Sequence, residues 1–260
     1  MHFNTIGGIF LKMATMKIFT AAVVKGGTAK TTTCTALSQI AAAAGQKVLA
    51  IDLDPQANFS SYIGADPNQP GSYDLLNGAT AALQLIQQTE QGIFGISASR
   101  NLGVIKTTPA SAMKLQKALD PLKNDYDVCF IDTPPGILEL QNVALHAATG
   151  LIIPLEPDSS SLQGLYQITD MANHAKKRNP DLSFTGIVLT KYDSRPAINR
   201  YLKDVLIEKG AEMGIPYLMD IRQGIKVREA QAMQQSLFDY APQSNPAKDY
   251  KKLYEIIMEG

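Results

Sequence analysis

Cysteine is scarce in this sequence. The 260 residues include only two, Cys34 and Cys129, and both lie inside apolar runs. We interpret them as small buried side chains of a protein kept in a reducing cytosol, and not as a disulfide pair. A fold stapled by disulfide bonds is therefore not expected.

The chain also lacks a net charge and a long apolar run. Lysine and arginine together number 24, as do aspartate and glutamate, so no global field favours or opposes nucleic acid, and any basic patch must be local. No apolar run approaches the roughly 20 residues of a membrane span, and the start has no features typical of a signal peptide. With 45% hydrophobic residues, the composition indicates a globular protein with one well-buried α/β domain.

A glycine turn between a strand and a helix is the strongest local feature. Residues 18–24 form an apolar run typical of a strand, and apolar side chains recur at helical spacing from residue 30 until Gly45. A strand–turn–helix of this kind surrounds a polyphosphate with backbone N–H groups and the positive end of a helix. We expect a nucleotide-binding loop made of Lys25, Gly26, Gly27, Thr28, Ala29, Lys30, Thr31 and Thr32.

Individual roles follow from the positions in this loop. A lysine at the helix start reaches the outer phosphates and the next hydroxyl ligates Mg²⁺, which assigns these roles to Lys30 and Thr31. The ordinary pattern has glycine at positions 24 and 29, where this chain has Val24 and Ala29, and the chain has the additional Lys25 before the glycine pair. Alanine resists positive φ by about 1 kcal/mol or more, so we expect nucleotide binding to persist with weaker affinity or slower turnover.

Two further apolar runs end in aspartates. Residues 47–54 end in Asp52 and Asp54, and residues 126–132 end in Asp132 before Thr-Pro-Pro-Gly. The carboxyl ends of parallel strands meet at one edge of a sheet, so these acids are expected beside the nucleotide loop. We expect Asp52 and Asp54 to orient water and the metal, because unpaired acids are costly in a dry core. Asp132 fits a carboxylate that holds Mg²⁺ through water, before a turn that moves when the terminal phosphate leaves.

The region between these runs is less informative. A short helix is expected over residues 81–88, and strand-like pieces at 94–97 and 102–107 suggest an edge pair. A helix is expected over residues 110–122.

The segments K-G-G-T-A-K-T-T, D-L-D-P-Q-A-N and Y-D-V-C-F-I-D-T-P-P resemble the motifs of the ParA/MinD family of deviant-loop ATPases. The resemblance covers residues 17–260 and implies a single-domain α/β P-loop fold, a twisted, mostly parallel sheet with helices on both faces. It implies that Lys25, Lys30 and Asp54 are catalytic, with Asp54 positioning the attacking water, and that Thr31 and Asp132 hold Mg²⁺. Residues 1–16 are expected to be an upstream extension or to precede an alternative start.

The base of the nucleotide is less certain than its phosphates. GTPases read guanine with a T-K-x-D sequence at a strand end, and Thr190-Lys191-Tyr192-Asp193 has this form. The longer run through Ser194-Arg195 also resembles a ParA-family segment, and that family uses ATP. We favour ATP, with Lys191, Tyr192 and Arg222 near the nucleotide, and GTP stays open.

Basic residues exceed acidic ones near the C-terminal end. From residue 191 to residue 228, eight basic residues face five acidic ones. Side chains of this kind contact nucleic-acid phosphates without regard to sequence. The resemblance implies that this surface of a dimer binds DNA non-specifically, and an ordinary solvated face is the alternative. The candidate residues are Arg195, Arg200, Lys203, Arg222, Lys226 and Arg228.

The function that the resemblance implies is DNA segregation. ATP would join two copies into a homodimer, each contributing Lys25 to the phosphates of the other, and a ParB-like centromere-binding partner would stimulate slow hydrolysis. A cytoplasmic, nucleoid-associated location in a bacterium follows from this function. The sequence does not indicate which plasmid, mobile element or other replicon would be moved.

The same scaffold carries other functions in related proteins. A MinD-like membrane-positioning ATPase would extend past residue 260 with a basic amphipathic anchor, whereas the final helix, expected over 247–260, has the spacing of a core-packing helix. No membrane partner is therefore expected. Iron–sulfur relatives would need cysteine ligands at a dimer interface, and a small-molecule ligase would need a second substrate pocket.

Overall fold

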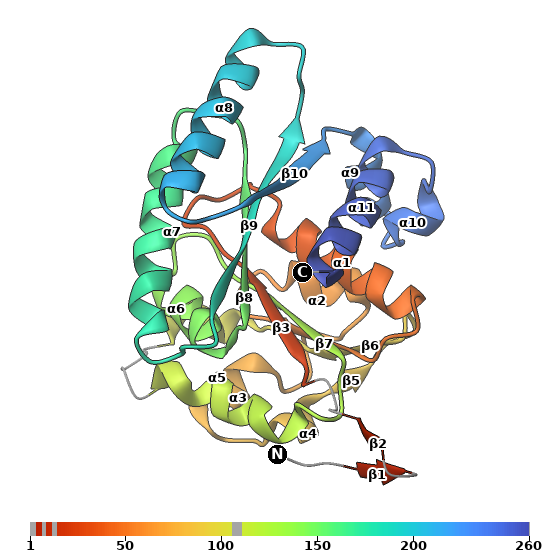
Figure 1. Cartoon of the computed structure of the whole chain (residues 1–260). Coiled ribbons are helices and arrows are strands. Elements are labelled where there is room, and N and C mark those ends of the chain that lie inside the picture. Colours follow the sequence, from red (N-terminus) through yellow and green to blue (C-terminus); the bar gives the residue numbers. More distant parts are fainter. Residues whose placement is uncertain (1–3, 7–8, 12–14, 106–110, 260) are drawn as a thin grey trace.

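A twisted sheet organises the molecule (Figure 1). The computed structural model describes residues 4–6, 9–11, 15–105 and 111–259. Eight strands lie in the order β10-β9-β8-β3-β7-β4-β6-β5, and all neighbours are parallel except β5, which is antiparallel to β6. The strands are β3 (Lys17–Ala21), β4 (Val48–Asp52), β5 (Gln87–Gln88), β6 (Ile93–Ile96), β7 (Val128–Asp132), β8 (Gly150–Leu155), β9 (Ser183–Tyr192) and β10 (Tyr217–Arg222).

Helices cover both faces of this sheet. One face carries α1 (Lys30–Ala43), α2 (Asn58–Ile63), α9 (Ile225–Ala232), α10 (Leu237–Tyr240) and α11 (Asn245–Glu259). The other carries α3 (Ser72–Asn77), α4 (Ala82–Leu85), α5 (Lys114–Leu119), α6 (Leu138–Ala147), α7 (Ser161–Lys176) and α8 (Ala197–Glu212). Short 3₁₀ helices are η1 (Arg100–Val104), η2 (Ser111–Met113) and η3 (Asp120–Leu122), and β1 (Asn4–Ile6) pairs with β2 (Ile9–Leu11). The expected α/β fold is confirmed.

Two hydrophobic cores result from the alternation of side chains along the strands. On β4, Leu49 and Ile51 pack towards α5–α7, whereas Val48 and Ala50 pack towards α1 and α11. All four are buried, as expected for a strand of a parallel sheet with helices on both faces. This burial explains why the central strands are continuous apolar runs and why the sequence predicts them.

The edge of the sheet differs from the prediction. Residues 100–104 form a 3₁₀ turn in place of a strand, with Leu102 buried under the sheet edge, and residues 106–110 lie outside the described part of the chain. Ile86 is extended, so the helix expected over 81–88 ends at Leu85 and residues 87–88 pair with β6. The helix expected over 110–122 is α-helical only over α5, and Pro121 opens the 3₁₀ turn that follows. Short apolar runs carry too little periodicity to separate these outcomes.

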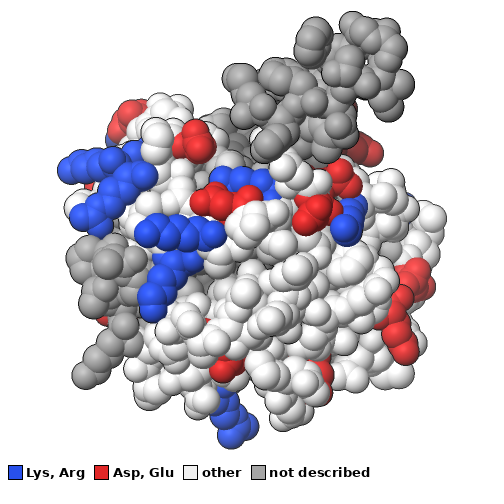
Figure 2. Space-filling model, turned by 90° about the horizontal axis from the view of Figure 1, so that it is seen from below, with Lys and Arg blue, Asp and Glu red and all other residues white. Residues whose placement is uncertain are grey.

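The lower side of the molecule carries charged side chains of both signs. Several lysine and arginine side chains gather on the left in the view from below, and single basic and acidic side chains are scattered between large uncharged areas over the rest of this side (Figure 2). None of the helices in the described residues has the length and apolar character needed to cross a bilayer. The strands β3, β4, β7 and β9 deliver their carboxyl ends to the opposite, upper side.

Candidate functional site

A cavity of about 840 Å³ opens where the central strands end. Residues 27–32, Asp54 and the turn at 134–135 form one side of it. The other side comes from the C-terminal third of the chain, through Lys191, the segment 221–225 and residues of α9. Tyr250 of α11 closes the floor, with its hydroxyl 3.4 Å from Thr33 Oγ1.

The loop before α1 has the backbone of an anion-binding turn. Gly27 and Ala29 both have positive φ, of 80° and 64°, and α1 starts directly after Ala29 with no side-chain cap. The first N–H groups of the helix therefore remain available for an anion. Ala29 adopts the left-handed conformation for which the ordinary sequence pattern has glycine. This conformation costs free energy because alanine carries a Cβ atom.

Lys30 lies inside this loop. Its side chain is buried and its Nζ donates to the carbonyl of Lys25 at 3.0 Å. Burial lowers the pKa of the Lys30 ammonium, and the carboxylates of Asp132 and Asp54 oppose that shift. The ammonium has three donors, so two remain for phosphate oxygens in the cavity.

Thr31 and Asp132 meet beneath the loop. Asp132 is fully buried, and its Oδ2 accepts a hydrogen bond from Thr31 Oγ1 at 2.7 Å. Its Oδ1 has no hydrogen-bond partner within the protein, and burial, followed by the charge of Asp52, raises the pKa of this carboxyl well above its usual value. An unpaired buried oxygen is costly. It fits a hydrated Mg²⁺, an ion that proteins hold with one or two carboxylates plus water and phosphate.

The two aspartates after β4 have different surroundings. Asp54 lines the cavity, and its Oδ1 accepts from Gln56 N at 2.9 Å. Asp52 does not line it: Oδ1 accepts from Asp54 N, and Oδ2 accepts from the backbone and hydroxyl of Ser60. The expectation that both acids act at the nucleotide is therefore wrong for Asp52, which braces the backbone of Asp54 and the start of α2. Burial raises the pKa of Asp52 to about 6 despite these hydrogen bonds.

The turn after β7 is fastened to the nucleotide loop. Thr133 Oγ1 donates to Ala21 O at 2.8 Å, and Gly136 N donates to Val24 O at 3.1 Å. Gln141 of α6 is fully buried and donates through Nε2 to Val23 O at 3.2 Å and to Pro134 O at 2.8 Å. One amide group thus joins both segments. The sequence did not identify Gln141, because a polar residue within a helix carries no sign of its contacts.

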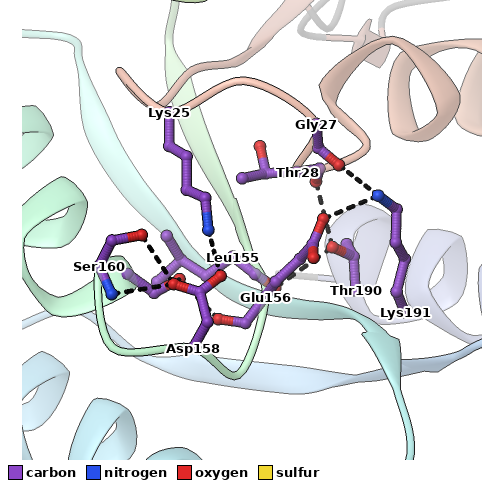
Figure 3. A network of polar contacts seen from close by, with 10 residues as sticks. Lys25, Gly27, Thr28, Leu155, Glu156, Asp158, Ser160, Thr190 and Lys191 are labelled. Atoms are coloured by element: carbon purple, nitrogen blue, oxygen red, sulfur yellow. Dashed lines mark hydrogen bonds and ion pairs between the residues drawn. The ribbon is translucent and has the colours of Figure 1, made fainter.

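A second network joins the loop to the segment after β8 (Figure 3). Lys25 forms an ion pair with Asp158 of its own chain. Lys191 Nζ lies 2.8 Å from Glu156 Oε1 and 2.6 Å from Gly27 O. Lys25, expected to point at another subunit, is thus held within its own subunit in this structure. The acids were visible in the sequence as Glu156-Pro157-Asp158, but nothing in the pattern linked them to the lysines.

The residues expected near the base are only partly brought together. Lys191 and Arg222 line the cavity, whereas Tyr192 is buried outside it, with the Lys203 ammonium 5.1 Å from its ring centre. Asp193 also lies outside the cavity, and its carboxylate is occupied by Arg195, with Nη2 at 2.7 Å from Oδ2. An aspartate that lies outside the cavity is poorly placed to read a guanine bound in it.

Most candidate DNA contacts have partners within the chain. Arg195, Lys203, Arg222 and Lys226 form ion pairs with Asp193, Asp220, Asp249 and Glu229. Arg200 donates to the backbone carbonyls of residues 194 and 195 and forms no ion pair with an acid among the described residues. Arg222 and Arg228 line the nucleotide cavity. The basic excess of this region is therefore smaller at the surface than the sequence count suggests.

The chain is similar to known proteins along most of its length. A family model described as an AAA domain matches residues 16–184. The chromosome partitioning protein ParA of Caulobacter vibrioides is 30% identical over 254 residues, which cover 94% of each chain. A structure described as cobyrinic acid a,c-diamide synthase from Mycobacterium smegmatis with bound ADP and magnesium is 26% identical with a TM-score of 0.79 and covers 94% of each chain. The cell division ATPase MinD of Pyrococcus furiosus is 26% identical with a TM-score of 0.75, covering 94% of this chain and 98% of that one.

The glycine turn, the buried lysine at the helix start and the aspartates at neighbouring strand ends define a P-loop nucleoside triphosphatase. The matches extend over most of the chain, and the chain belongs to the ParA/Soj/MinD family of deviant-loop ATPases. The resemblance expected from the motifs is confirmed.

Proposed function

We propose that this protein is a DNA-segregation ATPase that dimerises around ATP, binds DNA non-specifically as a dimer and is released when a ParB-like partner stimulates hydrolysis. The observation that carries the proposal is Lys25, which precedes the glycine turn and, unlike Lys30 and Asp54, does not line the cavity. A second lysine at this position has no use for the phosphates bound in its own loop, which Lys30 already serves. The 30% identity with a chromosome partitioning protein along nearly the whole chain supports the same reading.

The chain's own residues supply the elements of phosphoryl transfer. The N–H groups of residues 27–32 and the Lys30 ammonium bind the phosphates, and Asp54, held by Gln56 N and braced by Asp52, orients the attacking water. Thr31 and Asp132 would hold Mg²⁺, which neutralises phosphate charge. Asp54→Ala should remove hydrolysis while leaving ATP bound, and unchanged ATPase activity would reject Asp54 as the catalytic group.

Adenine is favoured over guanine as the base. The carboxylate of Asp193 would have to accept hydrogen bonds from guanine, but Asp193 does not line the cavity and its carboxylate is engaged by the exposed Arg195 side chain. Ile225 and Val227 line the cavity near α9 and suit the apolar face of either base, and the nearby lining residues include no carboxylate that could read guanine. Competition of ATP and GTP for the purified protein tests this choice, and equal affinities would contradict it.

A gel shift on unrelated DNA with ATP, ADP, GTP or no nucleotide tests the proposal as a whole. We expect a shift with ATP, a stronger and longer-lived shift with Asp54→Ala, and none with Lys30→Ala. Sedimentation velocity under the same conditions should show a dimer only with ATP and magnesium. A monomer at saturating ATP would contradict the proposed function.

A MinD-like role is the alternative, and an experiment on the same purified protein distinguishes the two functions. Co-sedimentation with anionic vesicles in the presence of ATP, without any DNA shift, would favour a membrane-positioning ATPase. A small-molecule ligase would hydrolyse ATP only with its second substrate and would bind neither DNA nor vesicles.

A further inference from the structure

Two acids in the segment between β8 and α7, Glu156 and Asp158, form ion pairs with the lysines on either side of the phosphate loop. Lys25 precedes the glycine pair and pairs with Asp158, while Lys191 lies near the end of β9 and contacts Glu156 and Gly27 O together. Figure 3 shows the two acids reaching the loop from one short segment, with Lys25 and Lys191 on either side. The contacts therefore join three chain segments that are far apart in the sequence.

Asp158 is fixed in place independently of Lys25. Its Oδ1 accepts from Ser160 N at 2.9 Å and from Ser160 Oγ at 2.7 Å, and Oδ2 accepts from Lys25. Ser161 Oγ donates to Glu156 O at 2.6 Å, which closes the same turn at the start of α7. The acid is thus a rigid acceptor, and Lys25, the longer and more flexible side chain, is the member of the pair that moves.

The pair keeps Lys25 away from the role that the proposed function gives it. Both side chains are 33% exposed, so the contact is accessible to exchange and its strength is that of a partly solvated ion pair. A lysine bound to Asp158 is not available to the phosphates of a second subunit. In the proposed dimer, the phosphates held by the second subunit must therefore replace Asp158 as the anion that contacts the Lys25 ammonium.

We propose that Asp158 is a positioning residue that holds Lys25 within its own subunit before dimerisation and so sets the ATP concentration at which dimers form. The inference rests on the proposed function, because Lys25 must reach the partner's phosphates in the dimer. A ligand shifts such an equilibrium only by the difference between its affinities for the two states. The phosphates of ATP held by a second subunit provide that difference, since they offer Lys25 more negative charge than one carboxylate.

Asp158→Asn tests the inference with little disturbance of the turn. Asparagine keeps an oxygen that accepts from Ser160 but loses the charge that attracts Lys25. The matched control is Glu212→Gln, which removes an ion pair with Lys209, a lysine that is also 33% exposed, on the surface of α8. The control should leave every property of the nucleotide site unchanged.

The first measurement does not depend on dimerisation. In nucleotide-free protein, mass spectrometry follows the acylation rate of Lys25 by an amine-reactive reagent. Loss of an ion pair worth up to about 1 kcal/mol should accelerate this reaction by up to about fivefold in Asp158→Asn. An unchanged rate would show that Asp158 does not hold Lys25 and would overturn the inference without affecting the proposed function.

The second measurement is an ATP titration of dimer formation by sedimentation velocity. Asp158→Asn should lower the midpoint several-fold, and Lys25→Ala should prevent dimers in both backgrounds. A faster acylation with an unchanged midpoint would overturn the inference and leave the proposed dimer standing. If wild type and Asp158→Asn both remain monomers at saturating ATP and magnesium, the proposed function fails and the inference fails with it.

Discussion

Ala29 has a backbone conformation that is unfavourable for a residue with a side chain. It has φ 64° and ψ 29°, a conformation that costs an L-residue about 1–2 kcal/mol and glycine almost nothing. The position lies between Thr28 and Lys30, both of which line the cavity. The strain therefore lies in the part of the loop that contacts phosphate.

Replacing Ala29 by glycine should relieve this strain. We expect Ala29→Gly to bind ATP more tightly or turn it over faster, and to raise the free energy of unfolding by about 0.5–1 kcal/mol after the greater entropy of unfolded glycine is subtracted. Nucleotide titration, turnover assays and urea unfolding measure the three quantities. Gln234→Gly is the control, since Gln234 has φ 51° away from the loop. Equal affinity and turnover in wild type and Ala29→Gly would remove this account.

Asp52 gives a pH dependence of stability with a defined sign. Its pKa is about 6 in the fold and 3.8 as a model value, so the folded state retains a proton that the unfolded state has lost between these values. The stabilisation is fully present below about pH 4 and is lost as the pH rises through 6, an effect of about 3 kcal/mol for a shift of this size.

The test compares wild type with Asp52→Asn in urea between pH 4 and pH 7, without magnesium. The unfolding free energy of wild type minus that of the variant should decrease steadily as the pH rises. Taking the difference cancels the carboxylates that do not interact with Asp52, several of which have lowered pKa values. A difference that stays constant with pH would contradict the assignment.

At the scale of elements, α6 connects two loops that must act together. Gln141 donates to the last residues before the glycine turn and to the first proline after β7. We expect Gln141→Met, which keeps the length but not the donors, to lower kcat by about tenfold, the size of one lost hydrogen bond to a positioned loop. The KM for ATP should change by less than about threefold, because the cavity wall itself stays in place.

A purely structural role for Gln141 predicts a different result. In that case the melting temperature of Gln141→Met would fall while kcat per folded molecule stayed unchanged. Steady-state kinetics together with thermal unfolding separate these outcomes. Asn142→Ala on the same helix, at a half-buried position, is the control for α6.

Strands and motif residues were predictable, and side-chain partners were not. β4 and β7 are buried on both faces, so their apolar runs identified them, and the glycine turn predicted the loop at whose end the structure has Lys30 and Thr31. Asp52 and Asp54 look alike in the sequence, and only the structure shows that Ser60 donates two hydrogen bonds to the carboxylate of Asp52. The contacts of Gln141 and Asp158 join segments more than 100 residues apart, a distance over which local patterns carry no information.

At the scale of the whole molecule, charge pairing decides which basic residues remain for DNA. Arg200 has no acidic partner in the described part of the chain, whereas Lys226 is paired with Glu229 on the same helix. We expect Arg200→Ala to weaken ATP-dependent DNA binding and to reduce the salt slope by about 1, as loss of one phosphate contact does. Lys226→Ala should change both much less: both variants lose one positive charge, but an ammonium already paired with Glu229 is less available to contact a phosphate.

Fluorescence anisotropy on an unrelated duplex across a salt series measures both variants. Equal losses from Arg200→Ala and Lys226→Ala would show that the ion pairs of the free chain do not persist on DNA. No loss from either would leave the basic region from 191 to 228 as an ordinary solvated face.

The cavity is assembled from both ends of the chain, with the glycine turn on one side and α9 and Tyr250 on the other. A ligand that bridges the two sides links their stabilities by mass action. Saturating nucleotide should therefore slow hydrogen exchange in α9 and α11, some 200 residues from the glycine turn along the chain. Through this linkage, the protein's last helices would report whether its first loop is loaded.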